Sequence, residues 1–142
     1  GTPPLPLIVS LMKALELIIP NIDKNYEYIT KLNNIIKDKL STYELVHINS
    51  TENSIPHILN FSLLKIKPET FIHALEEYNI FISTKSACSK SNTISSSVYA
   101  LTKNEELSYQ TLRISLSYLT TIEEVNKFLE VFDICYKRLL LK

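Results

Sequence analysis

The chain has 142 residues, of which 45% are hydrophobic and 21% are charged, with equal numbers of basic and acidic side chains. This length corresponds to one domain with a core of its own, and the composition is that of a soluble globular protein. The formal net charge of zero gives no electrostatic basis for bulk binding to DNA, RNA or anionic lipid.

The sequence carries few signs of targeting. No apolar run approaches the ~20 residues of a membrane-spanning helix, and the first residues are neither cationic nor apolar, unlike a signal peptide. The chain begins at Gly1 without a methionine, so we expect a fragment or a processed chain. Cys88 and Cys135 stand in different contexts, which predicts unpaired thiols and a cytoplasmic location.

Helical periodicity indicates two helices in the first 40 residues. The first starts at Pro6 and is expected to end at Pro20, and the second is capped by Asn21 and reaches Leu40. Two strands follow, at residues 43–48 and 57–63, joined by a polar turn. In the second strand Leu59, Phe61 and Leu63 alternate with Ile58, Asn60 and Ser62, so the first three are expected on the core face.

The second half of the chain is also predicted to contain both helices and strands. A helix starts at Pro68 and is followed by a short strand at residues 80–83, which leads into a serine-rich segment. Ser97 is expected to cap a short helix to Leu101. A strand at residues 111–117 and a long helix opened by a capping box at residues 121–124 complete the chain. This order predicts an α/β (α+β) two-layer sandwich, with residues 1–142 forming a single domain.

Cys88 stands out because of its surroundings. No acidic residue occurs between Tyr78 and Asn104, whereas Lys85, Lys90 and Lys103 do. Neighbouring cations lower the pKa of a thiol and thereby favour the reactive thiolate. Cys88 is therefore a candidate nucleophile or redox thiol. The alternative is a surface loop in which the cysteine has no function.

Two arginines and the remaining cysteine have different expected roles. Arg113 lies on the polar face of a predicted strand, where it either binds a carboxylate or phosphate or forms an ordinary surface ion pair. Arg138 lies in the last turn of a helix and is expected to be structural. Cys135 falls on an apolar helical stripe and is expected to be buried. The three histidines show no metal-site spacing, so no metal site is predicted.

Several segments together resemble the NifS/IscS-type cysteine desulfurases of the class V aminotransferase family. Residues 83–89, Ser-Thr-Lys-Ser-Ala-Cys-Ser, resemble the family's active-site loop. Residues 56–62, Pro-His-Ile-Leu-Asn-Phe-Ser, resemble its P-H-I-L-N-I-S strand. Matches at residues 97–101, 112–116 and 120–124, and at Gly1-Thr2-Pro3 with residues 8–16, follow in the family's order, so the resemblance covers nearly the whole chain.

The resemblance implies a part of an enzyme. The chain would be the carboxyl-terminal small domain of a fold-type I enzyme that depends on pyridoxal phosphate, and the large domain with the cofactor lysine would be absent. Cys88 would be the catalytic nucleophile that receives sulfur from L-cysteine as a persulfide, leaving L-alanine. Arg113 would bind the substrate carboxylate, and Thr2 would reach the cofactor phosphate of the other protomer in a homodimer.

The same resemblance predicts partners and leaves alternatives. A sulfur-acceptor protein would take the persulfide sulfur for iron–sulfur cluster assembly or tRNA thiolation, and the chain alone is expected to be inactive. Lys85 and Ser117 replace glycines of the family pattern, and Tyr118 replaces an arginine. Such replacements strain the backbone where φ must be positive. The alternatives are a selenocysteine lyase domain and a stand-alone interaction or regulatory module.

Overall fold

The computed structural model describes residues 1–84 and 94–141 of the chain. Within these ranges the helices are α1 (Leu5–Ile18), the 3-10 helix η1 (Ile19–Asn21), α2 (Ile22–Leu40), α3 (Pro68–Glu76), α4 (Ser96–Thr102), α5 (Glu105–Tyr109) and α6 (Ile122–Leu140). The strands are β1 (Val46–Ile48), β2 (Ile58–Leu63) and β3 (Thr111–Ser115).

The three strands form one antiparallel sheet in the order β1-β2-β3. In the β2–β3 ladder, Leu59 pairs with Ile114 and Asn60 pairs with Arg113. The strand expected at residues 43–48 is shorter than predicted, because a turn precedes Val46. The strand expected at residues 80–83 is reduced to a single bridge between Ser83 and Arg113, which lies on the opposite side of β3 from β2.

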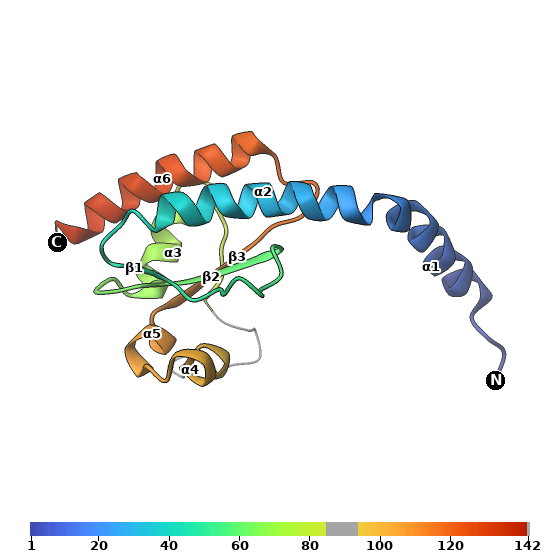
Figure 1. Ribbon diagram of the computed structural model, residues 1–142, viewed down its shortest axis with the longest axis horizontal. Helices are drawn as coiled ribbons and strands as arrows, with labels where there is room; N and C mark the ends of the chain where they lie inside the picture. Colours follow the sequence, from blue (N-terminus) through green and yellow to red (C-terminus); the bar gives the residue numbers. More distant parts are fainter. Residues whose placement is uncertain (85–93, 142) are drawn as a thin grey trace.

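Helices α2 and α6 run side by side over one face of the sheet, whereas α4 and α5 lie on the other side of the strands (Figure 1). Helix α3 packs against α6. The predicted alternation in β2 is confirmed, since Leu59, Phe61 and Leu63 are fully buried. The architecture is therefore of the α/β class that the sequence predicts, with the long helices on one face of the sheet and the short α4 and α5 on the other side.

Phe132 of α6 lies at the centre of the core. Its ring contacts those of Phe61 at 6.0 Å and Phe71 at 5.0 Å between centroids, so it joins the sheet to α3. The predicted capping box at the start of α6 is present. Thr121 Oγ1 accepts from the backbone N–H of Glu124, and Glu124 Oε2 accepts from the backbone N–H of Thr121.

Helix α1 differs most from the prediction. The predicted boundary itself is confirmed, because α1 ends at Ile18, Pro20 lies in η1 and α2 begins at Ile22, with a bend between α1 and α2 (Figure 1). The apolar face expected to be buried is exposed instead, and so are Val9, Met12 and Leu17 on the other faces. A helix that is apolar all round is typical of a buried element, yet nothing covers α1 in the described structure.

The expectation that no segment has the composition of a membrane helix was wrong. The helical segment Leu5–Leu40 contains an 18-residue window with a mean hydropathy of 1.7, none of which is buried. Pro20 concealed this segment in the sequence, because a proline was expected to interrupt it. Core helices and signal sequences share this length and composition, so the finding alone does not indicate a membrane.

Smaller differences concern α4 and α5. Ser95, rather than Ser97, caps α4, and its Oγ accepts from the backbone N–H of Val98. Helix α5 was not expected from the sequence. It is one short turn capped by Asn104, whose side-chain oxygen accepts from the N–H of Leu107 at 3.0 Å.

Candidate functional site

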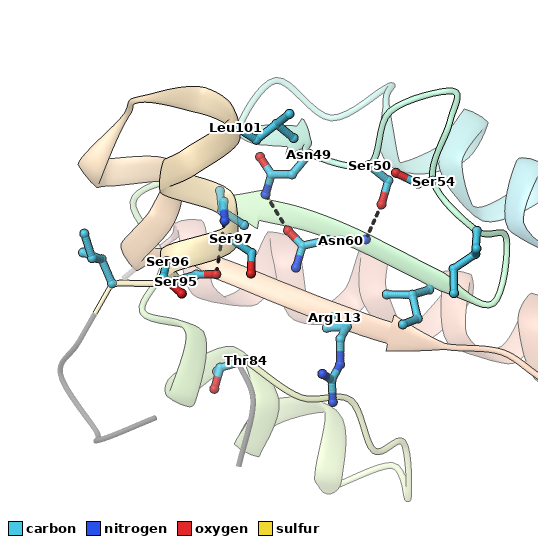
Figure 2. Close-up of a pocket in the computed structure, with 14 residues that line it drawn as sticks. Asn49, Ser50, Ser54, Asn60, Thr84, Ser95, Ser96, Ser97, Leu101 and Arg113 are labelled. Atoms are coloured by element: carbon cyan, nitrogen blue, oxygen red, sulfur yellow. Dashed lines mark hydrogen bonds between the residues drawn. The ribbon is translucent and has the colours of Figure 1, made fainter. Parts of the chain in front are cut away.

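A cavity of about 460 Å³ opens on the side of the sheet that faces α4. Figure 2 shows its walls, which come from the turn after β1, the strands β2 and β3, and the start of α4. Amide, hydroxyl and guanidinium groups line it together with a few aliphatic side chains. The polar lining residues are Asn49, Ser50, Ser54, Asn60, Thr84, Ser95, Ser96, Ser97 and Arg113.

Among the described lining residues, Arg113 provides the positive charge of this cavity. It is half-buried, and its Nε atom is buried without a hydrogen-bond partner in the described part of the chain. The five ion pairs between described residues do not include Arg113. Arg113 is thus placed at a polar cavity and not in an ion pair with a described residue, and its role in binding an anion remains a prediction.

The backbone around Arg113 connects this site to the segment that carries Cys88. The N–H of Ser83 donates to the carbonyl of Arg113 at 3.1 Å, and the N–H of Arg113 donates back at 2.6 Å. Thr84 and Ile94, which flank residues 85–93, both line the cavity. The described residues on either side of that segment therefore lie at the cavity. Cys88 and Lys85 lie outside the described residues.

The other predicted site residue is not brought to the cavity. Thr2 is exposed and precedes α1, whose free end extends away from the sheet (Figure 1). The cavity and Thr2 thus lie at opposite parts of the molecule. The role predicted for Thr2, at the cofactor phosphate of another protomer, remains a prediction.

One of the replaced glycines can be evaluated. Among the described residues, positive φ angles occur only at Lys65, Asn79 and Lys103. Ser117 is not one of them, so it causes no strain of the kind that its glycine counterpart would avoid. Instead it lies in a turn, where its N–H donates to Thr120 Oγ1 at 3.1 Å.

Two asparagines of the cavity were not singled out from the sequence. Asn49 follows β1 and is buried, and Asn60 is half-buried in the middle of β2. The available signal was the alternation of β2, which places Asn60 on the face opposite Leu59 and Phe61. Position alone did not indicate a binding residue, because polar side chains commonly occupy the second face of a strand.

The residues expected to be structural are placed as predicted. Cys135 is fully buried, its thiol donates to the carbonyl of Ala74 at 3.4 Å, and burial raises the pKa of the thiol. Arg138 donates from Nη1 to Glu77 Oε2 at 2.8 Å, and this hydrogen bond raises the pKa of Arg138. In residues 1–84 and 94–141, no cluster of three or more His, Cys, Asp or Glu side chains could hold a metal ion.

Among curated proteins, those similar to this chain include proteins named cysteine desulfurase and NifS homologue. The chain is 33% identical to a cysteine desulfurase IscS of Buchnera aphidicola subsp. Baizongia pistaciae over 98% of its own length and 34% of that protein. It is also 33% identical to a NifS/IcsS protein homologue of Lactobacillus delbrueckii subsp. bulgaricus, over 96% of this chain and 36% of the relative. The chain thus spans about a third of the length of these relatives.

Solved structures agree in fold. A NifS-like protein from Rickettsia africae superimposes with a TM-score of 0.78 at 26% identity, covering 96% of this chain and 36% of that one. A second NifS-like protein gives a TM-score of 0.77, also at 26% identity, over 94% of this chain and 34% of the neighbour. The family described as aminotransferase class-V matches residues 1–128. The chain therefore belongs to the aminotransferase class-V family.

Proposed function

We propose that the chain is the carboxyl-terminal small domain of a cysteine desulfurase that depends on pyridoxal phosphate. The relatives that match almost the whole chain carry that name and are about three times as long. The rest of such an enzyme would be a large domain outside this chain. Desulfurase activity would then belong to the complete protein, and residues 1–142 alone would be inactive.

The observation that carries this proposal is the setting of Arg113. A guanidinium at a polar cavity, whose buried Nε has no partner among the described residues, is suited to a carboxylate, which its planar donors bind in bidentate fashion. Thr84 and Ile94, the described residues on either side of the segment containing Cys88, line the same cavity. An amino-acid substrate held by its carboxylate would thus lie beside the segment that supplies the nucleophile.

The proposed reaction transfers one sulfur atom. The thiolate of Cys88 attacks the sulfur of L-cysteine, so a sulfur–sulfur bond forms while the bond between the substrate's sulfur and its β-carbon breaks. The electron pair of the broken bond stays with the carbon, which takes up a proton and gives L-alanine. Cys88 keeps the sulfur as a persulfide, and no external oxidant or reductant is required.

The cavity fits a substrate carboxylate better than the cofactor. No lysine is among its lining residues in the described chain, so the described residues offer no amine there for a Schiff base. We therefore assign the holding of pyridoxal phosphate to the large domain, with Thr2 of one protomer contacting the phosphate in a homodimer. The bound cofactor supplies an electron sink for amino-acid chemistry.

The proposal extends to partners and location. The persulfide sulfur would pass to an acceptor protein that serves iron–sulfur cluster assembly or tRNA thiolation. The low cysteine content supports a cytoplasmic location, where thiols stay reduced. A selenocysteine lyase would use the same site, and comparing cysteine with selenocysteine as substrates would separate the two activities.

The test uses the full-length protein that contains this chain. Cys88→Ser is expected to abolish the formation of alanine and persulfide from L-cysteine, because an alcohol cannot accept sulfur in this way. Cys135→Ala is the matched control, since that thiol is buried in the core, and it should keep turnover near the wild-type value. Normal turnover in Cys88→Ser would refute the role of Cys88, and a wild-type protein that yields no alanine would refute the proposed function.

A further inference from the structure

A chain of hydrogen bonds runs beneath the cavity, between the sheet and α5. Ser62 Oγ donates to the carbonyl of Leu107 at 2.7 Å. Asn49 Nδ2 lies 2.8 Å from Ser62 Oγ and 2.8 Å from Asn60 Oδ1. Thr111 Oγ1 lies 2.8 Å from the same Asn60 oxygen. Asn49, Ser62 and Thr111 are all buried.

The carbonyl of Leu107 fixes the direction of this chain. A carbonyl only accepts, so the single hydroxyl proton of Ser62 is directed to Leu107, and Ser62 Oγ must accept from Asn49. The group of Asn49 that faces Ser62 and Asn60 is therefore its NH₂, and the atom of Asn60 that receives it is the oxygen. The opposite orientation of Asn49 would set its oxygen against two other oxygens.

This orientation leaves one polar atom of Asn49 without a partner among the described residues. Asn49 Oδ1 is buried and has no hydrogen-bond partner in the described structure, and a buried unpaired acceptor is unfavourable. The two bonds that Asn49 donates hold the amide in this orientation despite the loss. Asn49 therefore serves here as a donor that positions Asn60.

The remaining hydrogen-bonding group of Asn60 is left for the cavity. Its oxygen already accepts from Asn49 and Thr111, and no described residue accepts from its Nδ2. Asn60 lines the cavity and lies directly opposite Arg113 in the β2–β3 ladder. Opposed side chains of neighbouring strands share one face, with Cβ atoms about 4.5–5.5 Å apart. Figure 2 shows both residues among the cavity walls.

We propose that Asn60 is a second substrate-binding residue, whose Nδ2 donates to the carboxylate of the amino-acid substrate alongside Arg113. Asn49 and Thr111 are positioning residues that orient this amide. The inference rests on the proposed function, because it names the substrate's carboxylate as the ligand. The amide of Asn60 would donate a directional hydrogen bond, and the guanidinium of Arg113 would supply a positive charge. Together they would bind a free carboxylate more tightly than a neutral ester.

The decisive variant is Asn60→Asp in the full-length protein. Aspartate has nearly the same shape and keeps an oxygen for Asn49 and Thr111, but it replaces the donor with a second, negatively charged oxygen. The KM for L-cysteine is expected to rise about 10- to 100-fold with little change in kcat. The preference for L-cysteine over L-cysteine methyl ester should fall by a similar factor. Asn34→Asp, which adds the same charge on an exposed part of α2, should leave both values unchanged.

The outcomes separate this inference from the function on which it depends. If Arg113→Ala raises the KM for cysteine while Asn60→Asp changes neither the KM nor the ester preference, the role of Asn60 is refuted and the function stands. Equal losses with cysteine and its ester would also refute it. If the wild-type protein forms no alanine from cysteine, both proposals fail.

A second variant covers the case in which Asn60→Asp does not fold. Thr111→Val keeps the volume of the side chain but removes one of the two donors that orient Asn60. It is expected to raise the KM for cysteine about threefold or more and to leave turnover of the methyl ester unchanged. An unchanged KM for cysteine in this folded variant would overturn the inference.

Discussion

Tyr43 is a residue at which ionisation and packing are coupled. Its hydroxyl donates to Asp133 Oδ1 at 3.1 Å, and its ring contacts those of Phe132 and Tyr136. Burial, followed by the hydrogen bond to Asp133, raises the pKa of Tyr43 from 10.0 to about 12. Because the folded-state pKa lies above the unfolded value, this contribution to stability is complete below pH 10 and is lost as the pH rises through about 12.

This coupling predicts a specific alkaline response. Tyr43→Phe removes the ionisable hydroxyl, so the variant should lose less stability than the wild-type chain between pH 10 and pH 12. Urea unfolding at pH 8, 10 and 12 measures the difference. Tyr109→Phe, at an exposed tyrosine, is the control and should follow the wild type. Parallel losses in the wild type and in Tyr43→Phe would show that Tyr43 does not contribute.

The placement of a single residue could be predicted from the sequence where the periodicity of its helix or strand decides which face it occupies. Cys135 could be placed in the core because it continues an apolar helical stripe, and Arg113 could be placed on the polar face because strand alternation fixes its side. The polar network of Asn49, Asn60 and Thr111 could not be predicted. Its members are 11 and 51 residues apart in sequence, and the pairing of β2 with both β1 and β3 brings them together.

At the scale of elements, α6 depends on its first turn. The capping box satisfies two backbone N–H groups at once. Thr121→Ala removes the oxygen that accepts from Glu124, so the free energy of unfolding should fall by about 1 kcal/mol. Glu124→Gln keeps an oxygen for the N–H of Thr121 and should cost less. Chemical unfolding measures both variants, and equal stability of Thr121→Ala and wild type would contradict the prediction.

The long elements were predicted more accurately than the short ones. The apolar periodicity of α2 and α6 extends over 19 residues each, so chance matches are improbable. Helix α5 has only five residues, too few to show a period, and it depends on the Asn104 cap. Pro20 indicated the boundary between α1 and α2 correctly, because a proline is disfavoured in a helix interior, and it lies in η1 between the two helices.

At the scale of the whole molecule, the exposed apolar surface of α1 is the dominant feature. Leu7, Leu11 and Leu17 are each more than 60% exposed, and contiguous apolar patches of this kind mark interaction surfaces or lead to aggregation. We therefore expect residues 1–142 to self-associate in solution, with an average mass that rises with concentration.

Sedimentation velocity tests this expectation. The double variant Leu7→Glu, Leu11→Glu should shift the chain toward a monomer of 16.3 kDa, because two charges interrupt the apolar surface. Asn126→Glu adds a charge to an exposed position of α6 and should leave the association unchanged. A wild-type chain that remains monomeric at all concentrations would show that α1 does not drive association.

The length of α1 makes the position of its first residues sensitive to the angle of the bend at η1. At 1.5 Å per residue, the 14 residues of α1 extend about 21 Å beyond the bend at η1. A change of about 10° at that bend would move the tip of α1 by about 4 Å, while the cavity at Arg113 stays fixed to the sheet. The three residues Ile19–Asn21 therefore set how accurately anything attached to α1 is aligned with the cavity, and rigidity at Pro20 would serve that alignment.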